Sequence, residues 1–343
     1  MFLPAEWHQQ AFVQLTWPHK DTDWAPVLAD AILCFCNMAR EVSKREPLLI
    51  VAKEPQEVLS ELEKQGIDTA NITLAPCPTN DTWARDHAFI TCINQGKLIL
   101  HDFQFNGWGL KFAANKDNLI NKTILPNITH LYQKNEVEYR NCLDFVFEGG
   151  SIESDGEGTL MVTSSCLLAD NRNNTLSQAE IERRLLTIFH ADRVHWIHHS
   201  WLAGDDTDGH IDTVARFCSP TSIAYVKCDD LNDEHYKELQ AMEQELLALR
   251  TADGKPYTLF PLPLPASCYD EEGNRLPATY ANFLIINGAV LVPTYHQPAK
   301  DEEALATLAR AFPYRDIVPI DCRVLILQHG SLHCSTMQFP TAN

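Results

Sequence analysis

Short runs of apolar residues, rich in β-branched and aromatic side chains, recur along the chain in pairs. A turn of glycine, asparagine, aspartate, serine or proline separates the two runs of each pair, which is the pattern of a β-hairpin. Asn94-Gln95-Gly96 and Asn287-Gly288 are two of these turns. The predicted hairpins pair residues 88–93 with 97–103, 145–153 with 159–163, 211–217 with 222–227, and 283–286 with 289–293.

Segments between the hairpins have apolar residues three or four positions apart, which predicts amphipathic helices. One of them opens on Ser177 and Glu180, a capping box in which the two side chains satisfy free amides of the first helical turn. The predicted helices cover residues 177–189, 233–250 and 300–312, and single strands are predicted at residues 48–52 and 194–197.

A hairpin, a helix and a strand together form a unit of roughly 60–70 residues, a length typical of repeats that bury a shared core. The 343 residues leave room for a fifth unit, which we expect to pair residues 334–338 with residues 10–15 and so join the two chain ends. The spacing therefore predicts an α/β fold in which a single domain, residues 1–343, forms a ring of five units with pseudo-fivefold symmetry around a channel. A two-domain α/β protein is the alternative.

The composition is that of an ordinary globular protein, with 45% hydrophobic and 21% charged residues. No apolar stretch of about 18 residues is present, so no transmembrane helix is predicted. The N-terminus also lacks the basic and apolar regions of a signal peptide. We therefore expect a cytoplasmic protein whose eleven cysteines are reduced. None of them has Cys-x-x-Cys spacing, and no metal site is predicted.

The formal net charge of −19 argues against nucleic acid and membranes as partners, because both carry negative charge. It favours a small cationic substrate, although many cytosolic enzymes are acidic for solubility alone. The sequence leaves a homo-oligomer open.

Polar residues with catalytic chemistry recur at about the same interval as the predicted units. They are Asp86, Glu148, His210 with Asp212, Asn282 and Cys334. Between 52 and 72 residues separate one position of the series from the next. If each unit presents the start of its hairpin to the channel, these side chains meet at one axis.

The combination of residue types favours chemistry on a cation. Cys334 needs a base or a lowered thiol pKa to act as a nucleophile, and His210, polarised by Glu148, is a candidate partner. A cysteine and a histidine alone would indicate acyl transfer, such as amide hydrolysis. Asp86 and Asp212 argue against that reaction because they would repel its developing oxyanion. Carboxylates instead bind a planar guanidinium through parallel N–H bonds.

Residues near Asp86 and Cys334 offer a further binding group and two alternative bases. Trp83 lies three residues before Asp86 and could cover the face of a bound cation. His329 and His333 flank Cys334 and are alternative bases. Residues 205–209 include three aspartates and resemble a calcium loop, but the spacing of an EF-hand is absent. We therefore interpret them as a loop leading to His210.

Eight stretches in collinear order span nearly the whole chain and are together specific. They are Pro4-Ala5-Glu6-Trp7, Leu15-Thr16-Trp17-Pro18, Asn80-Asp81-Thr82-Trp83-Ala84-Arg85-Asp86, Phe105-Asn106-Gly107-Trp108-Gly109, Glu148-Gly149-Gly150-Ser151-Ile152, Gly209-His210-Ile211-Asp212, Tyr280-Ala281-Asn282-Phe283 and His333-Cys334. Through them the sequence resembles the agmatine deiminases, in the bacterial peptidylarginine-deiminase-like group of the pentein superfamily. The resemblance implies a five-bladed α/β propeller of ββαβ units. Many relatives have an aromatic-rich segment where this chain has Thr213-Val214-Ala215-Arg216-Phe217.

The resemblance also implies roles for the spaced residues. Cys334 would be the nucleophile, His210 and Glu148 the proton-transfer pair, and Asp86 and Asp212 the groups that grip a guanidinium. The implied reaction passes through a thiouronium intermediate on the cysteine, from which water releases a ureido product. No metal or organic cofactor is implied.

We expect Trp83 and Asn282 to bind substrate as well, and the expected substrate is agmatine, converted to N-carbamoylputrescine and ammonia in polyamine biosynthesis or agmatine catabolism. Three alternatives stay open. They are a deiminase of free or peptidyl arginine, a non-catalytic propeller that binds guanidino compounds or polyamines, and an amidinotransferase.

The choice between agmatine and arginine depends on a cation that could bind the arginine carboxylate. Arg85 and Arg216 are the arginines inside the motifs. In a strand, Arg85 would face away from the site because it neighbours Asp86. Arg216 lies four residues after Asp212, on the same face of a regular strand, and so keeps the arginine alternative open.

Overall fold

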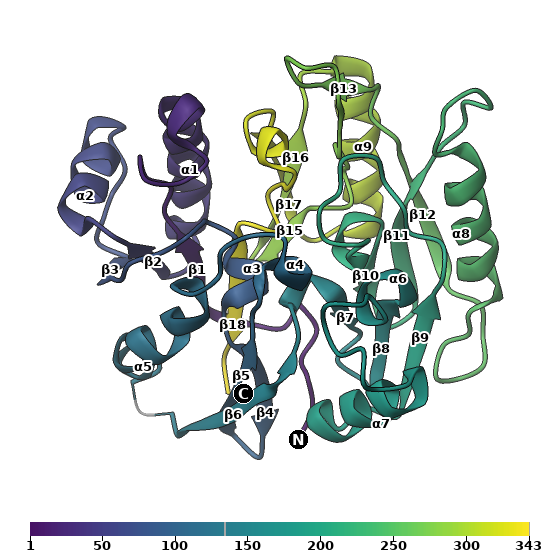
Figure 1. Ribbon diagram of the computed structural model, residues 1–343, viewed down its shortest axis with the longest axis horizontal. Coiled ribbons are helices and arrows are strands. Elements are labelled where there is room, and N and C mark those ends of the chain that lie inside the picture. Colours follow the sequence, from purple (N-terminus) through teal and green to yellow (C-terminus); the bar gives the residue numbers. More distant parts are fainter. Residues whose placement is uncertain (134, 343) are drawn as a thin grey trace.

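The computed structural model describes residues 1–133 and 135–342. Within these ranges the chain has a mixed α/β fold with five sheets of three or four strands and one two-stranded ribbon (Figure 1). In each of the five sheets, an antiparallel pair continues into a strand that is parallel to its neighbour. A parallel neighbour requires a crossover connection, which a helix supplies.

The elements follow one another in a regular order along the chain. The strands are β1 (Gln10–Thr16), β2 (Leu48–Ala52), β3 (Ile72–Pro76), β4 (Ile90–Asn94), β5 (Lys97–Gln104), β6 (Val137–Val146), β7 (Ile152–Ser154), β8 (Thr159–Thr163), β9 (Arg193–Ile197), β10 (Ala215–Ser219), β11 (Ser222–Lys227), β12 (Thr258–Pro263), β13 (Cys268–Tyr269), β14 (Arg275–Leu276), β15 (Leu284–Ile286), β16 (Ala289–Thr294), β17 (Asp316–Asp321) and β18 (Thr336–Pro340). The α-helices are α1 (Leu28–Ser43), α2 (Pro55–Lys64), α3 (Ala84–His87), α4 (Gly107–Leu110), α5 (Ile120–Leu131), α6 (Ser164–Leu167), α7 (Gln178–Phe189), α8 (Tyr236–Ala248) and α9 (Pro298–Ala311). The 3-10 helices are η1 (Ala25–Val27), η2 (Asp117–Leu119), η3 (Gly149–Ser151), η4 (Ile211–Thr213) and η5 (Leu325–Gln328).

All four predicted hairpins are present, as β4–β5, β7–β8, β10–β11 and β15–β16. Helices α5, α7, α8 and α9 then lead to the parallel strands β6, β9, β12 and β17. The predicted helices are confirmed as α7, α8 and α9, and the two predicted single strands as β2 and β9. Helix α7 begins with the predicted capping box, because the backbone amide of Ser177 donates to Glu180 at 2.8 Å.

Two predicted strands are interrupted where polar residues of the series lie. Residues 145–153 were expected to be extended throughout, but 3-10 helix η3 separates β6 from β7. Residues 211–217 likewise begin with η4, and β10 starts only at Ala215. The physical reason at η3 is close packing. A Cβ on Gly150 would lie 2.5 Å from Nδ1 of His210 and 2.9 Å from Oδ1 of Asp86.

The two ends of the chain pair with each other, as the sequence predicted. Strand β18 runs antiparallel to β1, with Phe12 opposite Phe339 and Leu15 opposite Thr336. Figure 1 shows these first and last strands side by side. The rings of Phe12 and Phe339 stack at 4.4 Å with an interplanar angle of 15°. The first and last segments therefore complete one sheet together.

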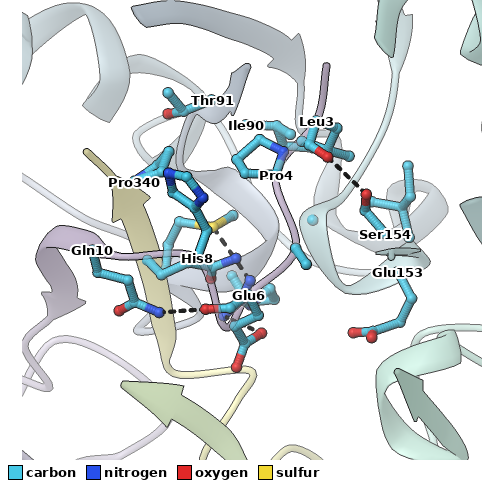
Figure 2. A pocket seen from close by; sticks show the side chains of 16 residues that line it. Leu3, Pro4, Glu6, His8, Gln10, Ile90, Thr91, Glu153, Ser154 and Pro340 are labelled. Atoms are coloured by element: carbon cyan, nitrogen blue, oxygen red, sulfur yellow. Dashed lines mark hydrogen bonds and ion pairs between the residues drawn. The ribbon is translucent and has the colours of Figure 1, made fainter. Parts of the chain in front are cut away.

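The segment that precedes β1 lies against the ends of β4, β7 and β18. Figure 2 shows Leu3, Pro4, Glu6 and His8 of this segment around a pocket. The Oγ of Ser154 in β7 donates to the carbonyl of Leu3 at 2.8 Å. The N-terminal segment is thus joined to strands from three different sheets.

Apolar side chains from the sheets and the crossover helices fill two buried clusters, one of which also contains Cys334. In Figure 1 the helices α2, α5, α7 and α8 lie around the outside of the molecule, while the short helix α3 lies near its middle. In the part of the chain that the structure describes, none of the helices is both long and apolar enough to cross a membrane.

Candidate active site

The spaced polar residues gather at the starts of the hairpins. Asp86 lies in α3, before β4, and Glu148 directly precedes η3 and β7. His210 and Asp212 belong to the turn of η4, before β10. Asn282 and Cys334 precede β15 and β18 in the same way. Each of the six side chains is buried.

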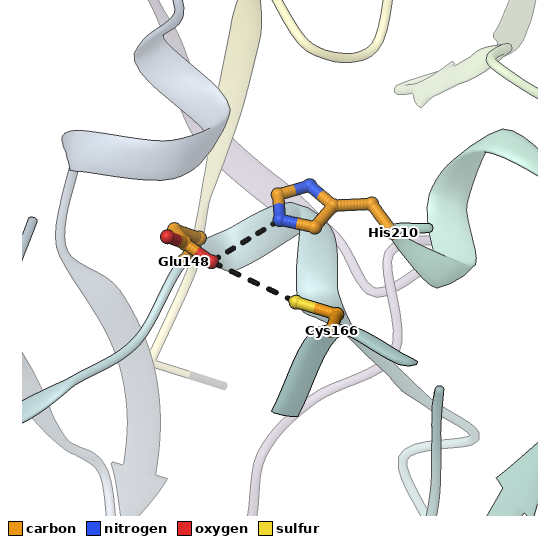
Figure 3. Close-up of side chains that lie close together, drawn as sticks. All are labelled: Glu148, Cys166 and His210. Carbon is orange, nitrogen blue, oxygen red and sulfur yellow. Dashed lines mark hydrogen bonds and ion pairs between the residues drawn. The ribbon is translucent and has the colours of Figure 1, made fainter. Parts of the chain in front are cut away.

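Glu148 and His210 form a contact within this group, drawn in Figure 3. Nε2 of His210 lies 3.2 Å from Oε2 of Glu148. Nε of Arg172 donates to both oxygens of Glu148, at 3.1 and 2.9 Å. Burial alone would raise the pKa of Glu148, but the charges of Arg172 and His210 outweigh it and hold the pKa below its usual value. The carboxylate is therefore ionised and fixed beside the imidazole.

His210 is an imidazolium with one ring nitrogen directed at Asp86. Burial would lower the pKa of His210, yet the carboxylates of Asp86 and Glu148 raise it well above its usual value. Nδ1 lies 3.6 Å from Oδ1 of Asp86 and has no hydrogen-bond partner within residues 1–133 and 135–342. A proton on this nitrogen is available to a molecule bound between His210 and Asp86.

Asp86 is held by two donors in a buried position. Nε1 of Trp108 donates to Oδ2 at 2.9 Å, and the backbone amide of Gly150 donates to Oδ1 at 3.0 Å. Burial raises the pKa of this carboxyl to about 6; His210 opposes the rise, and Asp212 and Glu148 add to it. A cation bound at this carboxylate would favour its ionised form.

Asp212 has one occupied and one open oxygen. Oδ2 lies 2.7 Å from Nδ1 of His333 and accepts from Nδ2 of Asn282 at 3.3 Å. Oδ1 is buried and has no hydrogen-bond partner among the described residues. Burial would raise the pKa of Asp212, but His333 and His210 hold it below its usual value. An ionised acceptor with an unused oxygen is the group that a guanidinium binds.

The thiol of Cys334 lies beside this carboxylate, with Sγ 3.8 Å from Oδ2 of Asp212. Burial, Asp212 and Asp86 raise the pKa of Cys334 well above its usual value. The cysteine is thus a neutral thiol while the site holds only its carboxylates. A cation placed between Asp86 and Asp212 would reverse the electrostatic part of this effect.

Asn282 connects the two sides of the site. Its Nδ2 donates to both the backbone carbonyl and Oδ2 of Asp212, each at 3.3 Å. Its Oδ1 accepts from the backbone amides of His333 and Cys334, at 2.9 and 3.2 Å. Because both ends of the amide are occupied, Asn282 fixes the Cys334 backbone next to Asp212.

A cleft leads to the thiol. It is lined by Asp23, Asp81, Trp83, Asp86, Trp108, Phe112, Asp206, Thr207, Gln328, His329, Gly330 and Cys334. Four of these residues are aspartates, and among the described lining residues none is lysine or arginine. Trp83 packs against Trp24 at 5.7 Å, and a Cβ on Gly330 would lie 2.4 Å from the Trp83 ring. The tryptophan is therefore fixed in the wall of an acidic cleft.

The expectation for Arg216 is wrong. Its guanidinium is fully buried and bonds Glu6 at 2.7 Å, Glu153 at 2.5 Å and the carbonyl of Phe283 at 2.5 Å. The prediction assumed a regular strand from Asp212 onward, whereas η4 intervenes and β10 begins after it. Arg216 is therefore engaged away from the cleft.

Arg85 also points away from the cleft, as expected, although it lies in α3 and not in a strand. Its side chain donates to the carbonyl of His333 at 3.4 Å and to Sδ of Met337 at 3.4 Å. His333 itself has carboxylates on both ring nitrogens, Asp212 and Glu6. His329 lines the cleft, with Nδ1 2.8 Å from the carbonyl of Gly204.

Sequence reasoning missed Trp108, Arg172 and Cys166. Trp108 lies in one of the quoted motifs, which was the one signal that could have found it. Arg172 follows α6 in a loop without any pattern, and its role depends on tertiary contacts with Glu148 and Asp208. Sγ of Cys166 lies 3.8 Å from Oε2 of Glu148 (Figure 3).

Among the residues that the structure describes, two groups of side chains have ligand atoms close enough for a metal ion, namely Glu148 with Cys166 and His210, and Glu6 with Glu153 and His333. In each group, however, a guanidinium already bonds a carboxylate. Arg172 bonds Glu148, and Arg216 bonds both Glu6 and Glu153. A positive charge in place of the ion opposes metal binding, so we assign no metal to either group.

Residues 2–340 match the model of the Porphyromonas-type peptidyl-arginine deiminase family. The chain belongs to this family. The resemblance seen in the motifs is therefore confirmed, and the chain is a member of a family of guanidine-modifying enzymes.

The relatives include enzymes named for two substrates. The agmatine deiminase of Pseudomonas aeruginosa (strain LESB58) is 33% identical to this chain. The match covers 98% of this chain and 95% of the length of the relative. A C. jejuni agmatine deiminase variant, solved with substrate bound, is 37% identical with a TM-score of 0.89 over 98% of this chain and 95% of its own. A Porphyromonas gingivalis protein provisionally named an arginine deiminase is 48% identical with a TM-score of 0.90, over 99% of this chain and 98% of its own.

Proposed function

We propose that this protein is an agmatine deiminase, which hydrolyses agmatine to N-carbamoylputrescine and ammonia. The reaction serves polyamine and putrescine biosynthesis or agmatine catabolism. The observation that carries the proposal is the acidic cleft in front of Cys334, whose described lining contains four aspartates and neither lysine nor arginine. Curated relatives named agmatine deiminase support the proposal.

The cleft suits a molecule with two positive charges and no carboxylate. The guanidinium of agmatine would lie between Asp86 and the open oxygen of Asp212, with the Trp83 ring along its face. The ammonium end would then reach Asp81 or Asp206 in the outer cleft. Arginine would add a carboxylate among these aspartates without a partner for it, since Arg216 is engaged elsewhere.

Substrate binding activates the nucleophile in this account. The cation between the two aspartates lowers the pKa of the Cys334 thiol, which gives up its proton to solvent water and becomes a thiolate. The thiolate attacks the guanidinium carbon, and a C–S bond forms. His210 donates its proton from Nδ1 to the departing nitrogen, which leaves as ammonia when the C–N bond breaks. A thiouronium remains on Cys334.

Water completes the reaction. His210, now neutral and held by Glu148, takes a proton from water, whose oxygen attacks the thiouronium carbon. The C–S bond then breaks while the new hydroxyl group gives its proton to the released ammonia, which leaves as ammonium. This step forms the carbonyl of the ureido product and regenerates the thiolate. Every proton and bond in this sequence is supplied by Cys334, His210, substrate and water.

The finer architecture is also part of the proposal. The five sheets share one order, an antiparallel pair followed by a parallel strand, and the first and last segments complete one sheet. These features support a five-bladed propeller of ββαβ units that forms one catalytic domain over residues 1–343. We propose a cytoplasmic location for this domain and a small cationic guanidino compound as its partner.

An ammonia-release assay with agmatine, free arginine and an arginine peptide tests the proposal. We expect ammonia and N-carbamoylputrescine in equal amounts from agmatine, and no ammonia from the Cys334→Ser variant. Ammonia from the peptide or from arginine alone would refute the assignment. Absence of turnover with all three compounds would favour a non-catalytic binding protein.

A further inference from the structure

The N-terminal segment reaches the active site through a chain of buried charges. Nδ1 of His333 lies 2.7 Å from Oδ2 of Asp212, and Nε2 of the same ring lies 2.7 Å from Oε2 of Glu6. All three side chains are buried. Asp212 and Glu6 are more than 200 positions apart in sequence, so the fold has placed a single imidazole between them.

The two contacts define the charge of His333. An ionised carboxylate only accepts hydrogen bonds, so an imidazole with a carboxylate on each nitrogen donates from both and is an imidazolium. Burial would raise the pKa of Glu6, but the charges of Arg216, His333 and Arg85 outweigh it and hold the pKa well below the usual range. Asp212 is likewise held ionised by His333.

Further charged groups surround these three side chains and balance their charges. Nη2 of Arg216, from β10, bonds Glu6 at 2.7 Å, and its Nε bonds Glu153, from β7, at 2.5 Å. Arg85, from α3, lies 3.8 Å from Glu6. The cluster thus holds three cations, Arg85, Arg216 and His333. It also holds three anions, Glu6, Glu153 and Asp212. Figure 2 shows the carboxylates of Glu6 and Glu153 on the same side of the N-terminal pocket.

The orientation of the Asp212 carboxylate depends on its contact with His333. His333 and Asn282 both bond Oδ2, which leaves Oδ1 as the oxygen without a partner among the described residues. We propose that Glu6 is a positioning residue for deimination, because it keeps His333 a charged double donor that holds Asp212 ionised with Oδ1 turned to the guanidinium. This inference rests on the proposed function of the site. It adds a role for a residue that lies outside the lining of the cleft.

Glu6→Gln tests the inference because the amide keeps the size of the side chain and removes its charge. His333 then loses a counter-charge and Asp212 loses the neighbour that keeps it ionised, so the pKa of Asp212 rises. Agmatine binding requires the ionised form and is therefore lost at a higher pH than in the parent protein. We expect KM for agmatine to rise at pH values below the raised pKa of Asp212, by roughly tenfold for each pKa unit of the change. The turnover number should fall less, since Asp212 grips substrate and transition state alike.

The measurement is kcat and KM for agmatine across pH 5 to 9, together with the melting temperature of each variant. Glu6→Asp restores the charge, and we expect the acidic limb of kcat/KM to return to the parent position. Glu46→Gln is the matched control. Glu46 is also a buried carboxylate, which accepts from the backbone amide of Asn287 at 3.2 Å, and its replacement should leave kcat, KM and the acidic limb unchanged.

His333→Gln gives a second test that does not depend on how Glu6→Gln folds. It removes the charged donor at Asp212 directly, and we expect the same shift of the acidic limb to higher pH. An unshifted acidic limb in a folded Glu6→Gln or His333→Gln protein would overturn the inference. So would an equal loss of kcat/KM at every pH, which is the result of a merely structural role. Failure of the parent protein to turn over agmatine would instead count against the proposed function.

Discussion

The reactivity of Cys334 depends on the charges that surround its thiol. Burial, Asp212 and Asp86 disfavour the thiolate, and in the proposed mechanism a cation bound between the two aspartates offsets their effect. The identities of these residues were predictable from the sequence, since their interval matched that of the hairpins. Arg172 and Cys166 were not predictable, because their places beside Glu148 depend on a loop and a short helix without any sequence pattern.

At the scale of single residues, we expect Cys334→Ser to lose turnover while keeping its fold, because a hydroxyl is a much weaker nucleophile at neutral pH. Cys268→Ser is the control, since this partly exposed cysteine lies in β13 and should be fully active. Labelling with a haloacetamidine should modify the Cys334 peptide at one equivalent. Substantial turnover by Cys334→Ser would contradict the covalent mechanism.

In the parent protein, where His333 and His210 hold Asp212 ionised, the pH dependence of kcat/KM should reflect Asp86. Its pKa is raised to about 6 and its ionised form binds the guanidinium, so kcat/KM should fall as pH drops through about 6. Trp108→Phe removes the N–H that stabilises this carboxylate, which raises the pKa further and moves the acidic limb to higher pH. Trp196→Phe, which loses a similar bond to the remote Glu182, should leave the limb in place. A limb that is identical in all three proteins would exclude Asp86 as its source.

At the scale of elements, turn chemistry and apolar spacing predicted the hairpins and their crossover helices. The two errors fell at η3 and η4, where the sequence also looks extended. These turns exist because Glu148, His210 and Asp212 must reach the site from the starts of strands, and local propensity does not contain that requirement. The misplacement of Arg216 has the same cause.

Gly150→Ala tests the packing of η3. Its Cβ would lie 2.5 Å from Nδ1 of His210, so the imidazole must move. We expect kcat for agmatine to fall roughly 10²-fold, as displacements of about 1 Å at catalytic groups do. Gly254→Ala is the control, because a Cβ there meets nothing within 4 Å despite a φ of +74°. An unchanged kcat in Gly150→Ala would show that His210 needs no such fixed position.

At the scale of the whole molecule, the chain ends meet in one sheet, and this pairing was predictable from the repeat. It matters for function because β18 begins two residues after Cys334. The acidic composition has a local counterpart as well, since the aspartates of the cleft come from segments that are far apart along the chain. Their convergence was not predictable from net charge.

Phe339→Ala tests the closing pair of strands. The ring is fully buried and stacks on Phe12, so its removal should lower the free energy of unfolding by about 3–5 kcal/mol. Urea denaturation measures this change. Tyr314→Ala, at a side chain that is 96% exposed, should change stability by less than about 0.5 kcal/mol. An equal effect of the two substitutions would mean that β1 and β18 contribute little to the folded state.

The most direct test of the account is the ratio of kcat/KM for agmatine to kcat/KM for free arginine, measured with the same protein at the same pH. The acidic lining of the cleft and the engagement of Arg216 predict a ratio well above one. A ratio of one or below would contradict the assignment of agmatine as the substrate.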